Sequence, residues 1–345
     1  MIHYKNFLIV TFFLTIYLFP LYTSIADTKK DNGASVFMYH RIGESKYPST
    51  NVTIEQFNKH INYISKNDFN IIPLDEVLSI ILNNEKFDKN TVSFSVDDAY
   101  ESFYLNAWPK FKENNIHVTL FVSTEIINNK TNGYMNWDQI RNFLNEGGSV
   151  GQHTASHLHM PLNSIDLVKN DILESHKTFI KELGFIPKLF AYPYGETSKE
   201  VINVLKEFNI THAFGQHSGV ISTFDNKYYL PRFSLNEQFS DLDRFIFAAE
   251  SLPLVIEDFL PSDMYLTQNL KPKIEFSIKT DIEIAQLNCF ANPGGNWSSQ
   301  KIINITENRV QILLNDNFKS GRGRINCTVQ QDKNWHWFGY QFLIK

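Results

Sequence analysis

Strand-like and helix-like segments alternate along the chain from Ser35 to about Pro261, and this alternation constrains the fold more than any other feature. Short apolar runs such as Val92–Val96 and Val118–Val122 are typical of buried strands, and amphipathic stretches such as Leu74–Leu82 separate them. Repeated strand–helix units predict a parallel sheet covered by helices. Because there are about seven or eight units, we predict an α/β fold built on a distorted (β/α) barrel.

Local signals mark the ends of several helices. Thr53, followed three residues later by Gln56, is a capping box and predicts a helix that starts there. Asp138 is expected to cap a second helix, and Gly184 is expected to end a long helix that begins at Asp166.

The pattern changes after Pro261. Six apolar segments follow, separated by turn residues, and the first two are residues 274–278 and 282–290. They predict a small all-β sandwich over residues 262–345. Trp297, Trp335 and Trp337 would suit a sugar-stacking platform, so this region is a candidate carbohydrate-binding domain. The alternative is that at least two of these tryptophans belong to the core.

The only two cysteines, Cys289 and Cys327, both lie in this C-terminal region. In an exported chain a lone pair is expected to form a disulfide. In the chain-entropy model that bond would stabilise the fold by about 3–4 kcal/mol. The alternative, half of a zinc site, lacks a C-x-x-C motif or a nearby pair of histidines.

The first 26 residues have the layout of a secretory signal peptide. Lys5 precedes an apolar run over residues 7–21, and small residues up to Ala26 form a cleavage site. We therefore expect a signal peptide over residues 1–26 and a secreted, periplasmic or cell-envelope protein. An uncleaved membrane anchor is the alternative, although the run is near the lower length limit for a span and contains Pro20.

Composition excludes some classes of function. Apolar residues make up 43% of the 345 residues, enough for a substantial core. The net charge is -5 and charged residues are spread along the chain, without the basic patch of a nucleic-acid-binding protein.

Polar residues with metal-binding chemistry follow the predicted strands. Asp97 and Asp98 end one strand, where adjacent carboxylates repel unless a cation or proton lies between them; the alternative is a solvated turn or helix cap. His153 and His157 are spaced to place two imidazoles on one face of a helical turn. One carboxylate and two imidazoles would leave positions open for water or substrate, which is typical of catalytic metal sites.

These segments resemble the polysaccharide deacetylases of carbohydrate esterase family four, the NodB homology domain. The family's Thr-Phe-Asp-Asp-Gly motif corresponds to residues 95–99, and its His-Ser/Thr-x-x-His motif is matched fully by residues 153–157. The third motif, near Arg-Pro-Pro-Tyr-Gly, corresponds to residues 191–195. The resemblance covers residues 35–261 and not the tail.

The resemblance implies a role for each matching residue. Asp97 would be the general base, and Asp98, His153 and His157 would be the metal ligands. The backbone N–H of Tyr194 would stabilise the oxyanion. Zinc is the expected metal, although nitrogen and oxygen ligands also suit cobalt or nickel.

Two features depart from the family pattern. Ala191 replaces the arginine that usually orients the base, and the late Leu-x-His motif with the general acid has no clear match. His212 and His217 lie in the right region without the right neighbours.

A subgroup of the family shares these departures. Residues 38–42 look similar to poly-N-acetylglucosamine deacetylases, and this similarity implies that His40 contributes to the site. Its position at the end of the first strand makes His40 the candidate general acid. The alternative is that His40 only caps the strand and hydrogen-bonds a neighbouring loop. Arg232 is a candidate replacement for the missing arginine beside Asp97, and a structural or surface arginine is the alternative.

The expected function is therefore a metal-dependent hydrolase that removes N-acetyl groups from an N-acetylated polysaccharide. The expected partner is that glycan, with no nucleic acid and no membrane contact except through an uncleaved signal segment. Two alternatives remain open: a catalytically degenerate glycan-binding protein, and another metal-dependent hydrolase on the same barrel.

Overall fold

The computed structural model describes residues 32–279, 282–293 and 295–345. The expected signal peptide over residues 1–26 lies outside this part of the chain. Within it, no helix is long and apolar enough to cross a membrane. The barrel and the C-terminal sheets together belong to one compact unit.

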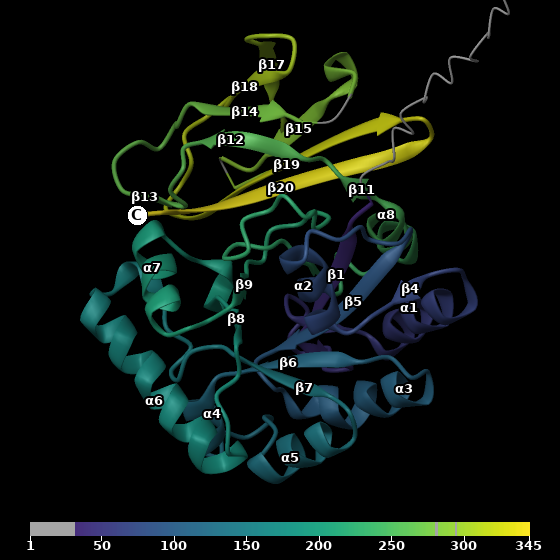
Figure 1. Ribbon diagram of the computed structural model, residues 1–345, viewed down its shortest axis with the longest axis vertical. Coiled ribbons are helices and arrows are strands. Elements are labelled where there is room, and N and C mark those ends of the chain that lie inside the picture. The colour runs from purple at the N-terminus through teal and green to yellow at the C-terminus, as the bar shows by residue number, and fades with distance from the viewer. Residues whose placement is uncertain (1–31, 280–281, 294) are drawn as a thin grey trace, which may run out of the picture. The chain divides into compact units, whose positions relative to one another are not determined.

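The larger part of this unit is a parallel sheet with helices on its outer side, and it confirms the predicted distorted barrel (Figure 1). The strand order is β10-β1-β5-β6-β7-β8-β9, with β4 beside β5. The strands are β1 (Ala34–Tyr39), β4 (Asn70–Ile71), β5 (Thr91–Asp97), β6 (Val118–Val122), β7 (Ser149–Gln152), β8 (Leu189–Ala191), β9 (His212–Phe214) and β10 (Phe233–Ser234).

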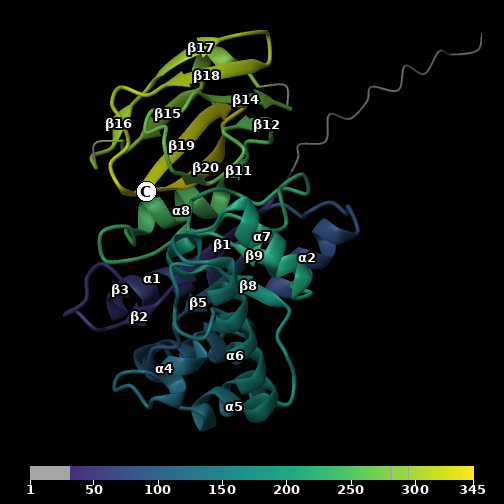
Figure 2. The same cartoon turned by 90° about the vertical axis from the view of Figure 1, so that its left-hand side faces the viewer.

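Helices connect successive strands and cover the outside of the sheet (Figure 2). They are α1 (Ile54–Lys66), α2 (Leu74–Leu82), α3 (Trp108–Glu113), α4 (Thr124–Asn128), α5 (Trp137–Asn145), α6 (Ile165–Leu183), α7 (Lys199–Glu207) and α8 (Leu242–Glu250). Apolar side chains of the sheet and helices form the core, in which aromatic rings from β1, β5 and α8 stack on one another.

The predicted helix ends are largely confirmed. Thr53 and Gln56 form the expected capping box of α1, and Gly184 ends α6 with a φ of 81°. Asp138 as the cap of α5 is wrong: the cap is Asn136, whose side chain accepts a hydrogen bond from the N–H of Gln139. The Gln139 side chain returns a bond to the cap, so the capping box begins the helix two residues earlier.

The C-terminal region forms two sheets that pack through one apolar core, as expected for a sandwich. One sheet contains β13 (Tyr265–Leu266) beside β20 and, in order, β11 (Leu252–Pro253), β20 (Asn334–Ile344), β19 (Gly321–Gln331), β15 (Asn288–Ala291) and β16 (Ser298–Ser299). The other contains β12 (Ile256–Leu260), β14 (Ile274–Ile278), β18 (Arg309–Leu313) and β17 (Lys301–Asn304). Because β11 and β12 pair with these sheets, the C-terminal β region begins before Pro261.

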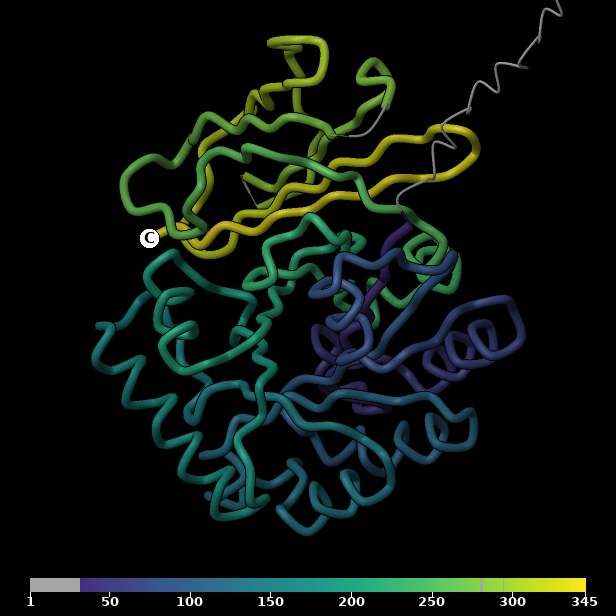
Figure 3. The backbone as a smooth tube through the Cα atoms, in the orientation of Figure 1, coloured from purple at the N-terminus to yellow at the C-terminus, as the bar shows by residue number. Residues whose placement is uncertain are grey.

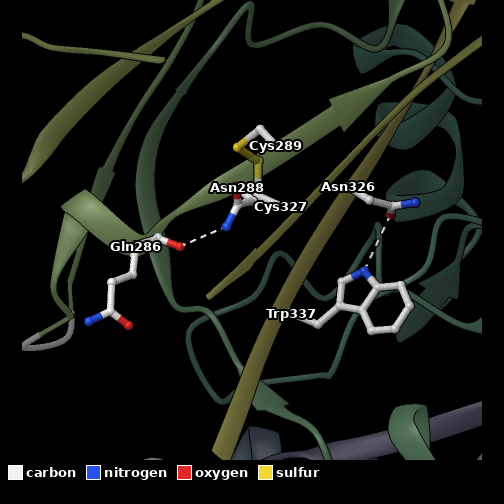
Figure 4. Close-up of a disulfide and its surroundings, with 6 residues drawn as sticks. All are labelled: Gln286, Asn288, Cys289, Asn326, Cys327 and Trp337. Carbon is white, nitrogen blue, oxygen red and sulfur yellow. Dashed lines mark hydrogen bonds between the residues drawn. A yellow bond between two sulfur atoms is a disulfide. The ribbon is translucent and has the colours of Figure 1, made fainter. Parts of the chain in front are cut away.

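One expected strand is shorter than predicted. Residues 282–290 were expected to be a single strand, but Ile284–Gln286 form a 3₁₀ turn and only Asn288–Ala291 pair as β15. The disulfide between Cys289 and Cys327 is confirmed (Figure 4). It joins directly opposed residues of β15 and β19 and lies in the sandwich core.

Strand β20 carries the contact between the sandwich and the barrel. β19 and β20 form a long hairpin, which can be followed in the backbone trace (Figure 3). The Trp337 side chain packs into the barrel core, so this tryptophan is a core residue. Gly339 faces the carbonyl of Ser218, which would lie 1.9 Å from a Cβ atom at that position. Only glycine allows this close approach of the two backbones.

Candidate metal centre

The functional residues expected from the sequence lie at the carboxyl ends of the barrel strands. Asp97 is the last residue of β5 and Asp98 follows it, while His153 comes directly after β7. His40 follows β1, and Tyr194 lies in the turn after β8. Because the strands are parallel, these positions meet at one end of the sheet.

Asp98, His153 and His157 converge on one point. The Oδ1 atom of Asp98 lies 3.4 Å from Nε2 of His153 and 3.2 Å from Nε2 of His157. Within the described residues, neither Asp98 Oδ1 nor His153 Nε2 makes a hydrogen bond, although both atoms are buried. Buried polar atoms rarely lack a partner. The three side chains therefore fit a cation, and their donor set suits zinc and similar divalent metals.

The ring of His153 is oriented for this role. Its Nδ1–H donates a hydrogen bond of 2.7 Å to the carbonyl of Ala191, which directs Nε2 toward the site. Burial by itself would raise the pKa of Asp98, but the neighbouring imidazoles outweigh it and hold the pKa well below its usual range. Burial would likewise lower the pKa of His153, but the carboxylates of Asp98 and Asp97 raise it. A proton and a metal therefore compete for His153.

Several site residues have left-handed backbone conformations, which are unfavourable for side chains other than glycine. The φ angles are 72° at Asp98, 63° at Thr154, 57° at His157 and 60° at Tyr194. Each such residue costs on the order of 1–2 kcal/mol, so the surrounding structure must hold it in place.

Asp171 of α6 supports the loop between the two histidines. Its carboxylate accepts hydrogen bonds from the backbone N–H of Ala155 at 2.7 Å and of Ser156 at 3.2 Å. Sequence analysis missed Asp171, because nothing in an amphipathic helix distinguishes a carboxylate that supports a loop from one that faces water.

Asp97 is fully buried and is paired with Arg232. The guanidinium donates to both carboxylate oxygens, at 2.7 and 2.8 Å, and also to Ser95 and to the carbonyl of Gly215. Burial raises the pKa of Asp97, but Arg232 outweighs this effect and the net pKa is lowered. Position 191, where the family motif has an arginine, is alanine in this chain. Arg232 supplies the guanidinium beside Asp97 instead.

The candidate histidines differ in position. His40 and His217 line the cavity above the metal centre, whereas His212 lies outside that lining. Burial lowers the pKa of His217 to about 3, so this ring is neutral near pH 7. Burial also lowers the pKa of His40, and the opposite effect of the Asp98 and Asp97 carboxylates is smaller, so the net pKa is lowered.

Tyr194 is held from both sides of the cavity. Its ring packs edge-on against His157 at 4.4 Å and stacks on His159 at 3.8 Å. Its carbonyl accepts a hydrogen bond of 3.0 Å from the buried side chain of Gln341, which in turn accepts one of 2.8 Å from Arg324. Sequence analysis missed Gln341 and Arg324, because both come from the C-terminal sheet.

The Asp98–His153–His157 cluster adjoins a cavity of about 890 Å³ that lies between the barrel and the sheet of β19 and β20. Barrel residues form one side, including Asp98, His157 and Tyr194. The C-terminal region supplies Phe290, Trp297, Arg322, Arg324, Ile325, Asn326, Thr328, Trp337 and Tyr340.

A parallel half-barrel with a carboxylate and two histidines at its strand ends is the architecture of a barrel hydrolase. Residues 84–213 match the family described as polysaccharide deacetylase. The three sequence motifs that resemble this family, at residues 95–99, 153–157 and 191–195, all lie within the matched region, which supports the assignment of this region to the family.

Known relatives agree with this assignment. The chain is 25% identical over 237 residues to a poly-beta-1,6-N-acetyl-D-glucosamine N-deacetylase of Staphylococcus aureus, a match that covers 60% of this chain and 80% of the relative. Two solved structures share the fold. The deacetylase PplD of Streptococcus pyogenes has a TM-score of 0.58 and 20% identity, with 63% of this chain and 98% of that chain covered. IcaB of Ammonifex degensii has a TM-score of 0.57 and 21% identity, with 64% and 99% covered.

Proposed function

We propose that this protein is a metal-dependent deacetylase that hydrolyses the acetamide groups of an N-acetylated polysaccharide at the cell envelope or outside the cell. The observation that carries the proposal is the juxtaposition of the Asp98–His153–His157 cluster with the buried Asp97–Arg232 pair. The cluster fits a divalent cation, and the pair holds a second carboxylate ionised beside it. A binding protein would need neither feature.

A divalent cation bound by the three side chains would supply Lewis acidity, which activates water and polarises the acetamide carbonyl. Zinc is the expected ion, and cobalt or nickel also suit these ligands. Asp98 provides the negative charge of the ligand set, and His153 is held in the binding orientation by its bond to Ala191.

Asp97 acts as the general base in this proposal. Arg232 occupies both carboxylate oxygens, so it keeps Asp97 ionised and fixes its orientation. The carboxylate takes a proton from the attacking water. As the carbonyl carbon becomes tetrahedral, the N–H of Tyr194 stabilises the negative charge on the oxygen.

His40 donates the proton that the departing amine requires. It lines the cavity near Asp97 and Asp98; burial lowers its pKa, and the two carboxylates offset that effect only in part. His217 is the less suitable acid, since burial lowers its pKa to about 3. The products are acetate and a free amino sugar.

Acetate release from N-acetylglucosamine oligomers tests the proposal. Metal-loaded protein should release acetate, and both Asp97→Asn and His157→Ala should abolish it. His157→Ala should also lose bound metal, measured by elemental analysis, while Asp97→Asn retains it. His176→Ala is the matched control, because His176 lies on α6 away from the cavity. Full metal occupancy in His157→Ala would contradict the ligand assignment, and metal binding without acetate release would favour the glycan-binding alternative.

The acid is tested separately. His40→Ala should keep its metal and lower kcat by about 10²–10⁴-fold. The loss should be smaller for an ester with a good leaving group, because such a group leaves without protonation. Equal loss on amides and esters would exclude His40 as the acid.

A further inference from the structure

The cavity wall formed by β19 is polar and basic. Every second residue of this strand from 322 to 328 lines the cavity: Arg322, Arg324, Asn326 and Thr328. The alternate residues, such as Cys327, point into the sandwich core. This is the two-residue period of a strand with one buried face, so the basic wall is a continuous surface of the sheet.

The charge of this wall is poorly balanced. Arg244 of α8 lines the same cavity, and Asp98 is the only acidic residue among the described residues that line it. Neither Arg244 nor Arg324 forms an ion pair within the described part of the chain: Arg244 donates to the carbonyl of Phe239, and Arg324 donates to Gln341. The whole chain has a net charge of -5, so this local excess of positive charge is not a general property of the protein.

Arg322 is only weakly neutralised. It lies 4.0 Å from Glu196, whose other carboxylate oxygen is bonded to His159 at 2.7 Å. Arg324 lies two residues further along the strand on the same face. Burial lowers its pKa to about 10, so it is cationic near neutral pH. Burying a guanidinium without a counter-ion is costly, and an anion in the cavity would remove that cost.

The neighbouring strand β15 and the segment before β16 offer surfaces on which sugar rings can stack. Phe290 and Trp297 line the cavity with 41% and 42% of their surfaces exposed. Exposed aromatic rings beside hydrogen-bonding side chains such as Asn326 suit a carbohydrate, which presents both apolar faces and hydroxyl groups. The cavity is continuous from these rings to Asp98.

We propose that the β19 wall binds an anionic substituent of the glycan, so that the preferred substrate is an N-acetylated polysaccharide that also carries carboxylate or phosphate groups. This inference rests on the proposed deacetylase function and deepens it. Arg322 and Arg324 would bind the anion, with Arg244 adding charge, while Phe290 and Trp297 hold neighbouring sugar rings. Guanidinium groups bind both kinds of anion by paired hydrogen bonds.

Matched substrates test this inference. A fluorescently labelled β-1,6-linked N-acetylglucosamine pentamer is prepared unmodified, with succinyl groups and with phosphoryl groups. Acetate release and equilibrium binding are measured with the metal-loaded full chain. At least one anionic pentamer should have a kcat/KM about 10–100 times that of the neutral one, as expected for hydrogen bonds between charged groups. The two anionic pentamers distinguish a carboxylate from a phosphate preference.

Variants identify the residues that cause the preference for anionic pentamers. Arg322→Gln and Arg324→Gln should each reduce the preference for the anionic pentamer, with little change in bound metal, and Arg324→Lys should retain part of it. Arg141→Gln is the matched control, because Arg141 has 41% of its side chain exposed against 42% for Arg322 but does not line the cavity. The preference should also weaken as the salt concentration rises.

The outcomes separate the two proposals. Equal binding and equal kcat/KM for neutral and anionic pentamers, or equal losses for both in the arginine variants, would overturn the inference. Acetate release from the neutral pentamer alone would support the deacetylase and refute the anionic site. Tighter binding of an anionic pentamer without acetate release from any pentamer would support the site and refute the deacetylase. The binding measurement thus keeps the two failures distinct.

Discussion

The pairing of Asp97 with Arg232 leads to the sharpest prediction. Replacing Arg232 with Gln removes a guanidinium that is fully buried and donates to both carboxylate oxygens. The Asp97 carboxylate then remains buried without the guanidinium, which also donates to Ser95 and to the carbonyl of Gly215. Breaking a buried pair from one side typically costs about 3–5 kcal/mol. We expect the free energy of unfolding at pH 7 to fall by about that amount.

A double variant distinguishes two contributions to the lost stability: the missing ion pair and the burial of an unpaired carboxylate. Arg232→Gln combined with Asp97→Asn removes both charges and leaves an amide beside an amide, so it should be more stable than Arg232→Gln alone. Urea unfolding of the wild type, both single variants and the double variant gives the coupling energy.

The electrostatics of Asp97 also predict how the stability of the wild type and of Arg232→Gln changes with pH. In the wild type the pKa of Asp97 is lowered, so the pair stabilises the protein above the unfolded pKa of about 4, and this stability is lost as the pH falls through the folded value. In Arg232→Gln burial dominates and the folded pKa rises, so the deficit relative to the wild type should shrink as the pH falls. Two results together would refute this account. Arg232→Gln and the double variant would have equal free energies of unfolding, and the loss of stability relative to the wild type would not depend on pH.

Three further predictions concern the support of the site and the fold. Asp171→Asn should weaken metal affinity by about 10–100-fold with little change in stability, since its carboxylate holds the loop between the two ligands; isothermal titration checks this. Replacing Cys289 and Cys327 together with Ala should lower the unfolding free energy by up to about 4 kcal/mol for a separation of 38 residues, measured in urea. Burial lowers the pKa of His60 to about 4, so the unfolded state binds more protons between pH 6.5 and 4; stability should fall by about 2 kcal/mol from this group on acidification to pH 5, and His60→Gln should reduce that loss in thermal unfolding.

Sequence reasoning predicted the barrel because its evidence is local. Apolar periodicity, a capping box at Thr53 and a terminal glycine at Gly184 each act over a few residues, and the structure confirms them. The proposed metal ligands could be named from the sequence for a related reason: His153 and His157 are close in sequence, and Asp98 directly follows a strand. The parallel sheet then brings their loops together without further information.

The remainder of the site depends on distant contacts. Gln341 reaches Tyr194 from a strand 147 residues away, and no local pattern links the two. Asp138 and Asn136 are both good caps by residue type, and only the reciprocal bond with Gln139 decides between them. The same limit applies to the β19 wall, since an alternating strand shows which residues share a face but not what that face contacts.

Arg232 shows how a chain can depart from a family motif and still present the same chemical group. Ala191 is buried in an apolar cluster that also contains Phe121 and Phe214. The ring centroids of Phe121 and Phe214 lie 5.3 and 5.8 Å from the Arg232 guanidinium, which bonds to Asp97. The small side chain at position 191 is therefore compatible with a guanidinium that arrives from the segment before β10, 41 residues further along the chain. The Asp97 carboxylate requires a guanidinium at hydrogen-bonding distance. The segment of the chain that supplies this guanidinium can change, and the charge pair and the proposed base are still retained.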